Sequence, residues 1–93
     1  MPTVLIVHDV DDYQEWKSAF YGAAGLRKQA GEVSFDLLRF DENPNRIVHL
    51  SEWTSLDAAR QFFQSAEVAE IRRKAGVHEP QFCYLERLES GIL

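Results

Sequence analysis

Residues 33–53 read VSFDLLRFDENPNRIVHLSEW, and this stretch decides the fold. Val33–Phe40 and Arg46–Trp53 are both rich in the β-branched and large apolar residues that strands favour. The linking residues Asp41–Asn45 include a proline, which fixes its own backbone angle, and an asparagine, which tolerates the left-handed region. The stretch therefore predicts a β-hairpin.

Upstream of the hairpin the apolar spacing changes from that of a strand to that of a helix. Tyr13, Trp16 and Phe20 recur within Asp11–Gln29 at the spacing of one helical face. Gly31 follows, and glycine commonly ends a helix because it adopts positive φ without strain. We therefore expect a helix over Asp11–Gln29.

A second helical region follows the hairpin. Thr54 or Ser55 can cap it, and Ser65 can break and recap it. A further helical stretch, Glu67–Ala75, then stops at Gly76. The apolar positions of the first part form one stripe: Leu56, Ala59, Phe62, Phe63 and Ala66.

The two ends of the chain supply the outer strands. Thr3–Asp9 is a short apolar run, and Gln81–Leu88 is a second one after Pro80, with His78 in a loop before it. The order strand, helix, strand, strand, helix, strand predicts an α+β fold of ferredoxin-like βαββαβ type with a four-stranded antiparallel sheet. The 93 residues, 1–93, fit a single domain.

Composition excludes several classes of function. A net charge of -5 argues against nucleic acid as a partner, because binding to the phosphate backbone needs a basic face. Cys83 is the only cysteine, so neither an internal disulfide nor a cysteine-based zinc site can form, and a reducing, cytoplasmic location is expected. The apolar run Val4–Val7 is too short for a membrane span.

Side chains alternate across a strand, so each strand divides between two sheet faces. With Leu37 placed opposite Leu50 in the hairpin, the predicted helix-facing set is Leu5, Val7, Phe35, Leu37, Val48, Leu50, Cys83 and Leu85. The other face would carry Val4, Ile6, His8, Asp36, Leu38, Phe40, Ile47, His49, Ser51, Trp53, Phe82, Tyr84, Glu86 and Leu88. Nothing in the chain remains to cover this apolar face, so we expect a homodimer in which two sheets stack and enclose a pocket.

Three segments carry a family resemblance: DYQEWK at residues 12–17, DENPN at 41–45 and EWTSLDAA at 52–59. They resemble the dimeric α+β barrel superfamily, and within it the antibiotic biosynthesis monooxygenase-like domains. The resemblance implies a homodimer whose sheets pack into a barrel, with a ligand cavity in each protomer. Trp53 lies where such domains often place a tryptophan after the third strand.

Members of this superfamily include cofactor-independent monooxygenases acting on phenols and quinols, isomerases and haem-degrading enzymes. The haem-degrading members pair an asparagine on the first strand with a histidine on the second helical segment. Here the first strand has His8 and Asp9, and Glu67–Ala75 contains no histidine. The resemblance therefore disfavours haem degradation.

Two histidines are the candidate catalytic residues. His8 and His49 fall on neighbouring central strands, and an imidazole with a pKa near 6.5 can remove a phenolic proton, although either could instead be a hydrogen-bonded interface residue. Together with Asp36 or Glu86 they could also form a two-histidine, one-carboxylate metal set, which we rank below a metal-free site.

The same predicted face supplies the ligand-binding candidates, which are Asp36, Phe40, Ser51, Trp53, Tyr84 and Glu86. Trp53 and Tyr84 could stack on an aromatic ligand, or could simply pack at a dimer interface. The predicted function is a monooxygenase without cofactor or metal, acting on a small phenolic or quinol-type molecule. The alternative is a non-enzymatic module that binds a small apolar ligand or only dimerises.

Overall fold

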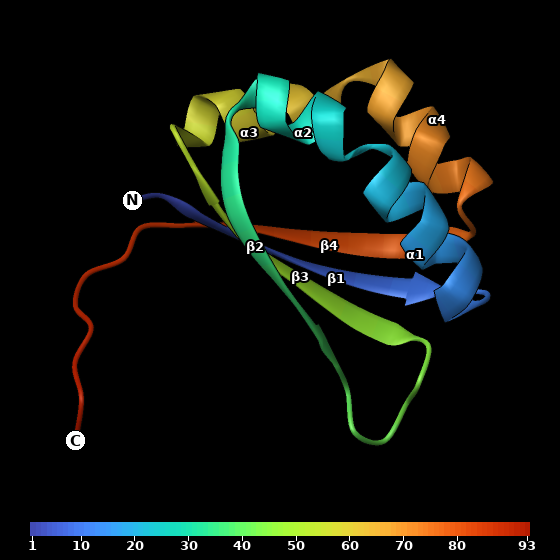
Figure 1. Cartoon of the computed structure of the whole chain (residues 1–93), viewed down its shortest axis with the longest axis horizontal. Coiled ribbons are helices and arrows are strands. Elements are labelled where there is room, and N and C mark those ends of the chain that lie inside the picture. The colour runs from blue at the N-terminus through green and yellow to red at the C-terminus, as the bar shows by residue number, and fades with distance from the viewer.

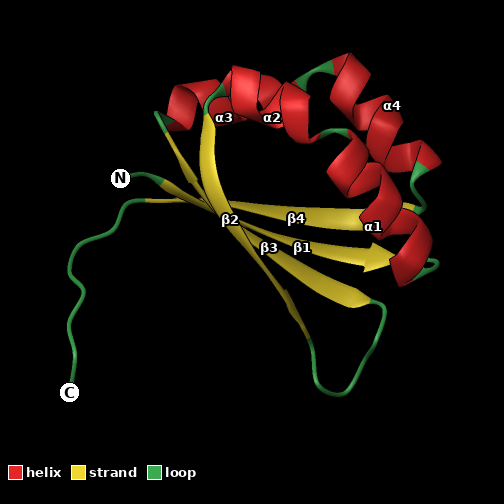
Figure 2. Cartoon of the chain, viewed as in Figure 1, coloured by secondary structure: helices red, strands yellow, loops and turns green.

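The computed structural model describes all 93 residues and contains four strands and four helices (Figure 1). The elements in chain order are β1 (Thr3–Val10), α1 (Tyr13–Gly22), α2 (Ala24–Ala30), β2 (Glu32–Arg39), β3 (Arg46–Trp53), α3 (Leu56–Gln64), α4 (Ala66–Lys74) and β4 (Val77–Leu85). The strands form one antiparallel sheet in the order β2-β3-β1-β4. All the helices lie on one side of this sheet (Figure 2). The predicted ferredoxin-like α+β fold is confirmed.

The predicted helix over Asp11–Gln29 is in fact two helices that meet at Ala23. Gly22 and Gly25 flank the break, and glycine lowers helix propensity by about 1 kcal/mol relative to alanine. The second helical region is broken as predicted. Ser65 ends α3 and caps the start of α4, where its hydroxyl oxygen accepts a hydrogen bond from the backbone amide of Val68 at 3.3 Å.

β4 begins at Val77 rather than Gln81 and ends at Leu85 rather than Leu88, so His78 lies in a strand and not in a loop. Pro80 is tolerated within it because β4 is an edge strand, where a missing amide donor costs little. The pairing with β1 also shifts between Val7 and Asp9, which leaves Glu79 and Pro80 opposite His8 as a bulge.

The predicted hairpin forms, but its register differs by one residue from the prediction. Leu37 pairs with His49 rather than Leu50, because five residues separate Phe40 from Arg46 in the closing pair. A shift of one residue moves every side chain to the other face of the sheet. Phe35 and Leu37 face the helices as predicted, but the assignment of β1, β3 and β4 is reversed.

The helices therefore cover the residues that were expected to face a partner. Trp53 and Ile47 are completely or almost completely buried, and His8, His49 and Ser51 are buried with them. The uncovered side, here called the open face, carries Leu5, Val7, Leu38, Phe40, Val48, Leu50, Cys83 and Leu85. Cys83 is exposed there, not packed under the helices.

The core beneath the helices consists of two apolar clusters. One, near α3 and α4, contains Val4, Ile6, Trp53, Ala59, Phe63 and Val68. The other, near α1, contains Val10, Trp16, Phe20 and Ile47. The helices are all too short and too polar to cross a lipid bilayer.

Candidate functional site

The two histidines lie between these apolar clusters, on the two central strands. His8 on β1 pairs with Ile47, and His49 on β3 pairs with Ile6, so the imidazoles occupy neighbouring rows on the helix side. Only 4% of His8 and 2% of His49 is exposed. Buried polar rings are costly unless they gain partners, so the surroundings of each decide what it can do.

His8 is an imidazole held neutral. Its ring packs on Trp16 with 5.4 Å between centroids, and its Nδ1 is buried without a hydrogen-bond partner. Burial lowers the pKa of His8 to about 3, assisted by the nearby charges of His49 and Arg72. His8 therefore stays uncharged at neutral pH and can donate or accept one hydrogen bond.

The bulge in β4 lies directly opposite His8. Glu79 at this point has a φ of 46°, in the left-handed region that residues other than glycine seldom adopt. Bulges are over-represented beside active sites, because they re-aim side chains or end strand pairing. The backbone next to His8 is thus irregular.

His49 belongs to a buried chain of charged groups. Its Nε2 lies 2.8 Å from Oε2 of Glu32, and Nε of Arg27 donates to the other oxygen of Glu32 at 2.8 Å. The Arg27 guanidinium also donates to the carbonyl of Phe20 and lies over the Phe20 ring, 3.7 Å from its centroid. The side chains of Arg27, Glu32 and His49 are each 6% exposed or less.

Glu32 remains a carboxylate in this environment. Burial by itself would raise its pKa, but the hydrogen bonds and charges of His49 and Arg27 together hold the pKa of Glu32 below its ordinary value. A buried carboxylate is costly unless it is paired, and this one is paired through both oxygens.

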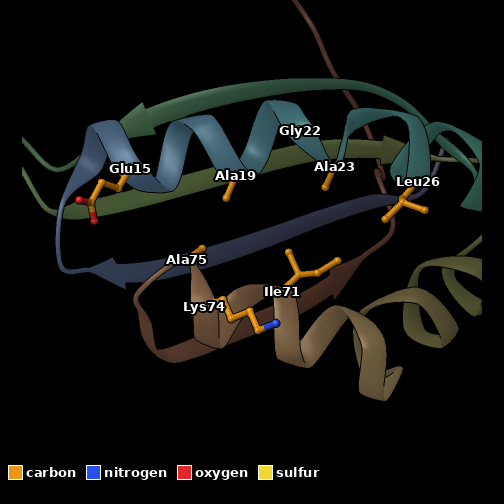
Figure 3. A pocket seen from close by; sticks show the side chains of 8 residues that line it. All are labelled: Glu15, Ala19, Gly22, Ala23, Leu26, Ile71, Lys74 and Ala75. Carbon is orange, nitrogen blue, oxygen red and sulfur yellow. The ribbon is translucent and has the colours of Figure 1, made fainter.

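A groove on the helix side lies between α1 and α4, with a volume of about 350 Å³, and neither histidine is among its lining residues. Figure 3 shows its two walls facing each other across β1. Its lining is mostly small or apolar, and each wall has one charged residue, Glu15 on α1 and Lys74 on α4. The lining residues are Glu15, Ala19, Gly22, Ala23, Leu26, Ile71, Lys74 and Ala75. The groove suits a small, largely apolar molecule.

Arg72 brings a positive charge from α4 to the same region. Its Nη1 donates to the carbonyl of Phe63 at 3.0 Å, and its guanidinium lies over the Phe82 ring, 5.0 Å from the centroid. Burial lowers the pKa of Arg72 from its ordinary value of 12.5. A half-buried cation of this kind can stabilise an anion formed close by.

The predicted ligand-binding residues divide between the two sides of the sheet. Ser51 and Trp53 are core residues joined by a 2.8 Å hydrogen bond from Trp53 Nε1 to Ser51 Oγ, and Tyr84 is half-buried on the same side. Asp36 and Phe40 lie on the open face, and Glu86 follows β4 in the extended C-terminal segment. The expectation that they share one face was wrong, because it rested on the shifted register.

The proposed metal set is not assembled either, since Asp36 and Glu86 lie away from both histidines. No three His, Cys, Asp or Glu side chains converge closely enough to hold an ion. Arg27, Glu32 and Arg72 were not predicted from the sequence. No local signal points to Glu32, because regular alternation from Phe35 and Leu37 would place it on the open face.

Comparison with known proteins agrees with this architecture. The model of the antibiotic biosynthesis monooxygenase family matches residues 8–74. Curated proteins gave no match. Among solved structures, SnoaB, a cofactor-independent oxygenase from Streptomyces nogalater, is 21% identical with a TM-score of 0.76, over 96% of this chain and 94% of SnoaB.

Two further structures share the fold. A Bordetella bronchiseptica protein named after the same family is 23% identical with a TM-score of 0.76, over 95% of this chain and 97% of its own. A conserved protein from Methanosarcina mazei is 17% identical with a TM-score of 0.73, over 94% of this chain and 92% of its own. The family match spans well over half of the sequence, and this chain therefore belongs to the antibiotic biosynthesis monooxygenase family, within the dimeric α+β barrel superfamily.

Proposed function

We propose that this protein is a cofactor-independent monooxygenase that acts on a small phenolic or quinol-type molecule. The observation that carries the proposal is the pair of buried imidazoles on adjacent central strands, one bonded to a carboxylate and one held neutral, on the side of the sheet where α1 and α4 form a largely apolar groove. Membership of the family and likeness to a cofactor-independent oxygenase support it.

The reaction needs no reductant besides the substrate. Loss of a phenolic proton gives a phenolate, which passes one electron to dioxygen; the resulting radical and superoxide join through a new C–O bond. The O–O bond then breaks as the ring carbon loses its C–H proton, so that one oxygen atom stays on the ring and the other leaves as water with that proton and the one taken from the phenol. A quinol and dioxygen thus become a hydroxyquinone and water, with atoms and electrons balanced.

The two histidines take different parts in this scheme. We assign proton abstraction to His49, because the Glu32 carboxylate 2.8 Å from its ring stabilises the imidazolium that forms. His8 resists a proton, so we assign it a neutral hydrogen bond to the substrate oxygen. The cation of Arg72 would stabilise the phenolate and superoxide charges.

Access to the histidines requires movement of two rings of α1. Trp16 packs against His8, and Phe20 contacts His49 edge-on with 4.9 Å between centroids. Both rings belong to the helix that forms one wall of the groove. We propose that substrate binding in the groove displaces them, since small alanine and glycine residues leave space beside α1.

A pair of glycine variants tests where the substrate binds. Gly22 lines the groove, and a Cβ added there meets no atom within 4 Å, so Gly22→Phe can fill the groove without a backbone clash. Gly25→Phe is the matched control, because Gly25 is equally open but does not line the groove. We expect oxygen consumption with a panel of quinols in the wild type, a KM raised at least tenfold in Gly22→Phe, and little change in Gly25→Phe.

Failure of the wild type to consume oxygen with any quinol would end the monooxygenase proposal. The near-complete burial of both histidines favours a second candidate, a non-enzymatic module that binds an apolar ligand in the groove. Binding of such ligands without turnover, abolished by Gly22→Phe, would support that candidate.

The open face supports a homodimer as the form in which the protein acts. Leu38 is 51% exposed and Phe40 40% exposed, and they share this face with Val48, Leu50 and Leu85. We propose that a second copy covers this surface, because no other part of the chain does. Sedimentation should then give twice the monomer mass of 10.7 kDa. The free thiol of Cys83 suits a reducing compartment, and we place the protein in the cytoplasm.

A further inference from the structure

We infer that Glu32 is a positioning residue, which fixes the ring orientation and the tautomer of His49 and is itself locked by Arg27. Its effect on turnover rests on the proposed function, but its effect on the histidine ring does not.

A bulge at the start of β2 turns Glu32 toward the helices. Glu32 pairs with Trp53 and Ser34 pairs with Glu52, so Val33 is an extra residue with no partner on β3. With regular alternation Glu32 would share the open face with Ser34, because the two lie two residues apart. The bulge instead places the carboxylate on the buried side, next to His49.

Each oxygen of Glu32 then has one partner. Oε1 accepts from Arg27 Nε at 2.8 Å, and Oε2 lies 2.8 Å from His49 Nε2. An arginine has only donors, and a carboxylate has only acceptors. The oxygen that faces His49 can therefore only accept, so Nε2 carries a proton, and in the neutral ring Nδ1 keeps its lone pair.

This tautomer is the one that proton abstraction requires. The lone pair on Nδ1 accepts the phenolic proton, and the resulting imidazolium stays hydrogen-bonded to Glu32 through Nε2. The aromatic rings of Phe20, Phe35 and Phe63 contact the imidazole edge-on and prevent it from turning over. Arg27 is held in turn by a hydrogen bond to the Phe20 carbonyl, which keeps its guanidinium on Glu32.

Glu32→Gln reverses the tautomer by the same logic. The Arg27 donor still needs an acceptor, so the oxygen of the introduced amide faces Arg27 and its NH₂ group faces His49. Nε2 must then accept, which moves the ring proton to Nδ1 and removes the lone pair that accepts from the substrate. In comparable carboxylate–histidine pairs this substitution lowers kcat by about 10⁴-fold.

Long-range proton–nitrogen NMR of the His49 ring at pH 7 is the primary test. We expect the wild type to show protonated Nε2 and bare Nδ1, and Glu32→Gln to show the opposite. Glu70→Gln is the matched control, because Glu70 pairs with Arg73 on the exposed surface of α4. It should leave the His49 resonances and the oxygen consumption unchanged.

Protonated Nδ1 in the wild type would overturn the inference, and this measurement holds even if Glu32→Gln does not fold. An unchanged His49 tautomer in folded Glu32→Gln would also overturn it. A reversed tautomer in a protein that oxidises no quinol would uphold the role of Glu32 and refute the proposed function. A reversed tautomer with a kcat at least a hundredfold lower would support both.

Discussion

Both faces of this sheet carry apolar side chains, but they differ in how their polar groups are paired. On β3, the helix side carries Ile47, His49, Ser51 and Trp53, and the polar side chains among them bond to Glu32, to the Val4 carbonyl and to one another. The open face is mainly aliphatic but also carries Asp36, Arg46 and Glu52, and Nε of Arg46 and Oε2 of Glu52 are buried there without a hydrogen-bond partner. The candidate site and the surface that we expect a second copy to cover therefore lie on opposite faces of one sheet.

The helix-covered face therefore differs from the open face in its paired polar groups and not in its hydrophobicity. A histidine or serine in a sheet is affordable only where other elements supply hydrogen-bond partners. Here Arg27 from α2 and Glu32 from the bulge supply them. The open face has fewer such groups, and a second sheet stacked there has to pair the ones it covers, such as Asp36.

The largest expected effect lies on the helix side. Trp53 is fully buried and contacts Phe62 and Phe63, so Trp53→Ala should lower the free energy of unfolding by about 3–5 kcal/mol. Urea denaturation monitored by circular dichroism measures this. The loss should be the same at low and high protein concentration. Phe40→Ala is the comparison, measured at a protein concentration low enough for the monomer. If Trp53→Ala lowers the free energy of unfolding no more than Phe40→Ala does, the assignment of the two faces is wrong.

Acid should destabilise the helix side through His8. Its pKa is about 3 in the folded protein against 6.5 when unfolded, so the unfolded chain takes up the proton first as the pH falls. Stability is therefore complete above pH 6.5 and is lost toward pH 3, by about 3 kcal/mol between pH 7 and pH 4. His8→Leu should lack this loss, whereas Glu32, whose pKa is also lowered, contributes in both proteins. Parallel pH curves for wild type and variant would show that His8 is not held neutral by burial.

Much of the fold could be predicted because its signals are local. The turn at Asp41–Asn45, the double cap at Ser65 and the glycine stops at Gly31 and Gly76 each depend on a few neighbouring residues. The two stops indeed have positive φ values of 126° and 79°. Propensity and capping rules therefore gave the correct order of elements.

The assignment of faces could not be predicted in the same way. It depends on whether the hairpin loop holds an odd or even number of residues, and an error of one carries through every paired strand. The contacts among Arg27, Glu32 and His49 could not be predicted either, because they depend on a bulge at Val33 that no local sequence pattern indicates. Both failures concern pairing between strands, where one sequence is compatible with two registers.

Charge introduced on the open face should weaken association and leave the fold intact. Leu38→Asp places a carboxylate in the surface that we expect a second copy to cover, so the dimer Kd should rise about a hundredfold, or about 2.7 kcal/mol. Leu26→Asp is the control, because Leu26 is similarly exposed at 40% but lies on α2 among the helices. Sedimentation equilibrium should separate the two variants, and equal Kd values would place the interface elsewhere.

The smallest expected effect concerns Cys83, a free thiol on the open-face side of β4. Because it pairs with Leu5 within the apolar surface, a second sheet stacked there should shield its sulfur from a maleimide reagent. We expect labelling to slow several-fold as protein concentration rises through the dimer Kd, since only the monomer reacts freely. Leu38→Asp should label at the same rate at every concentration, because it stays monomeric over this range. A wild-type rate that does not depend on concentration, in a protein that sedimentation shows to dimerise, would mean that the second copy binds a surface that does not include β4.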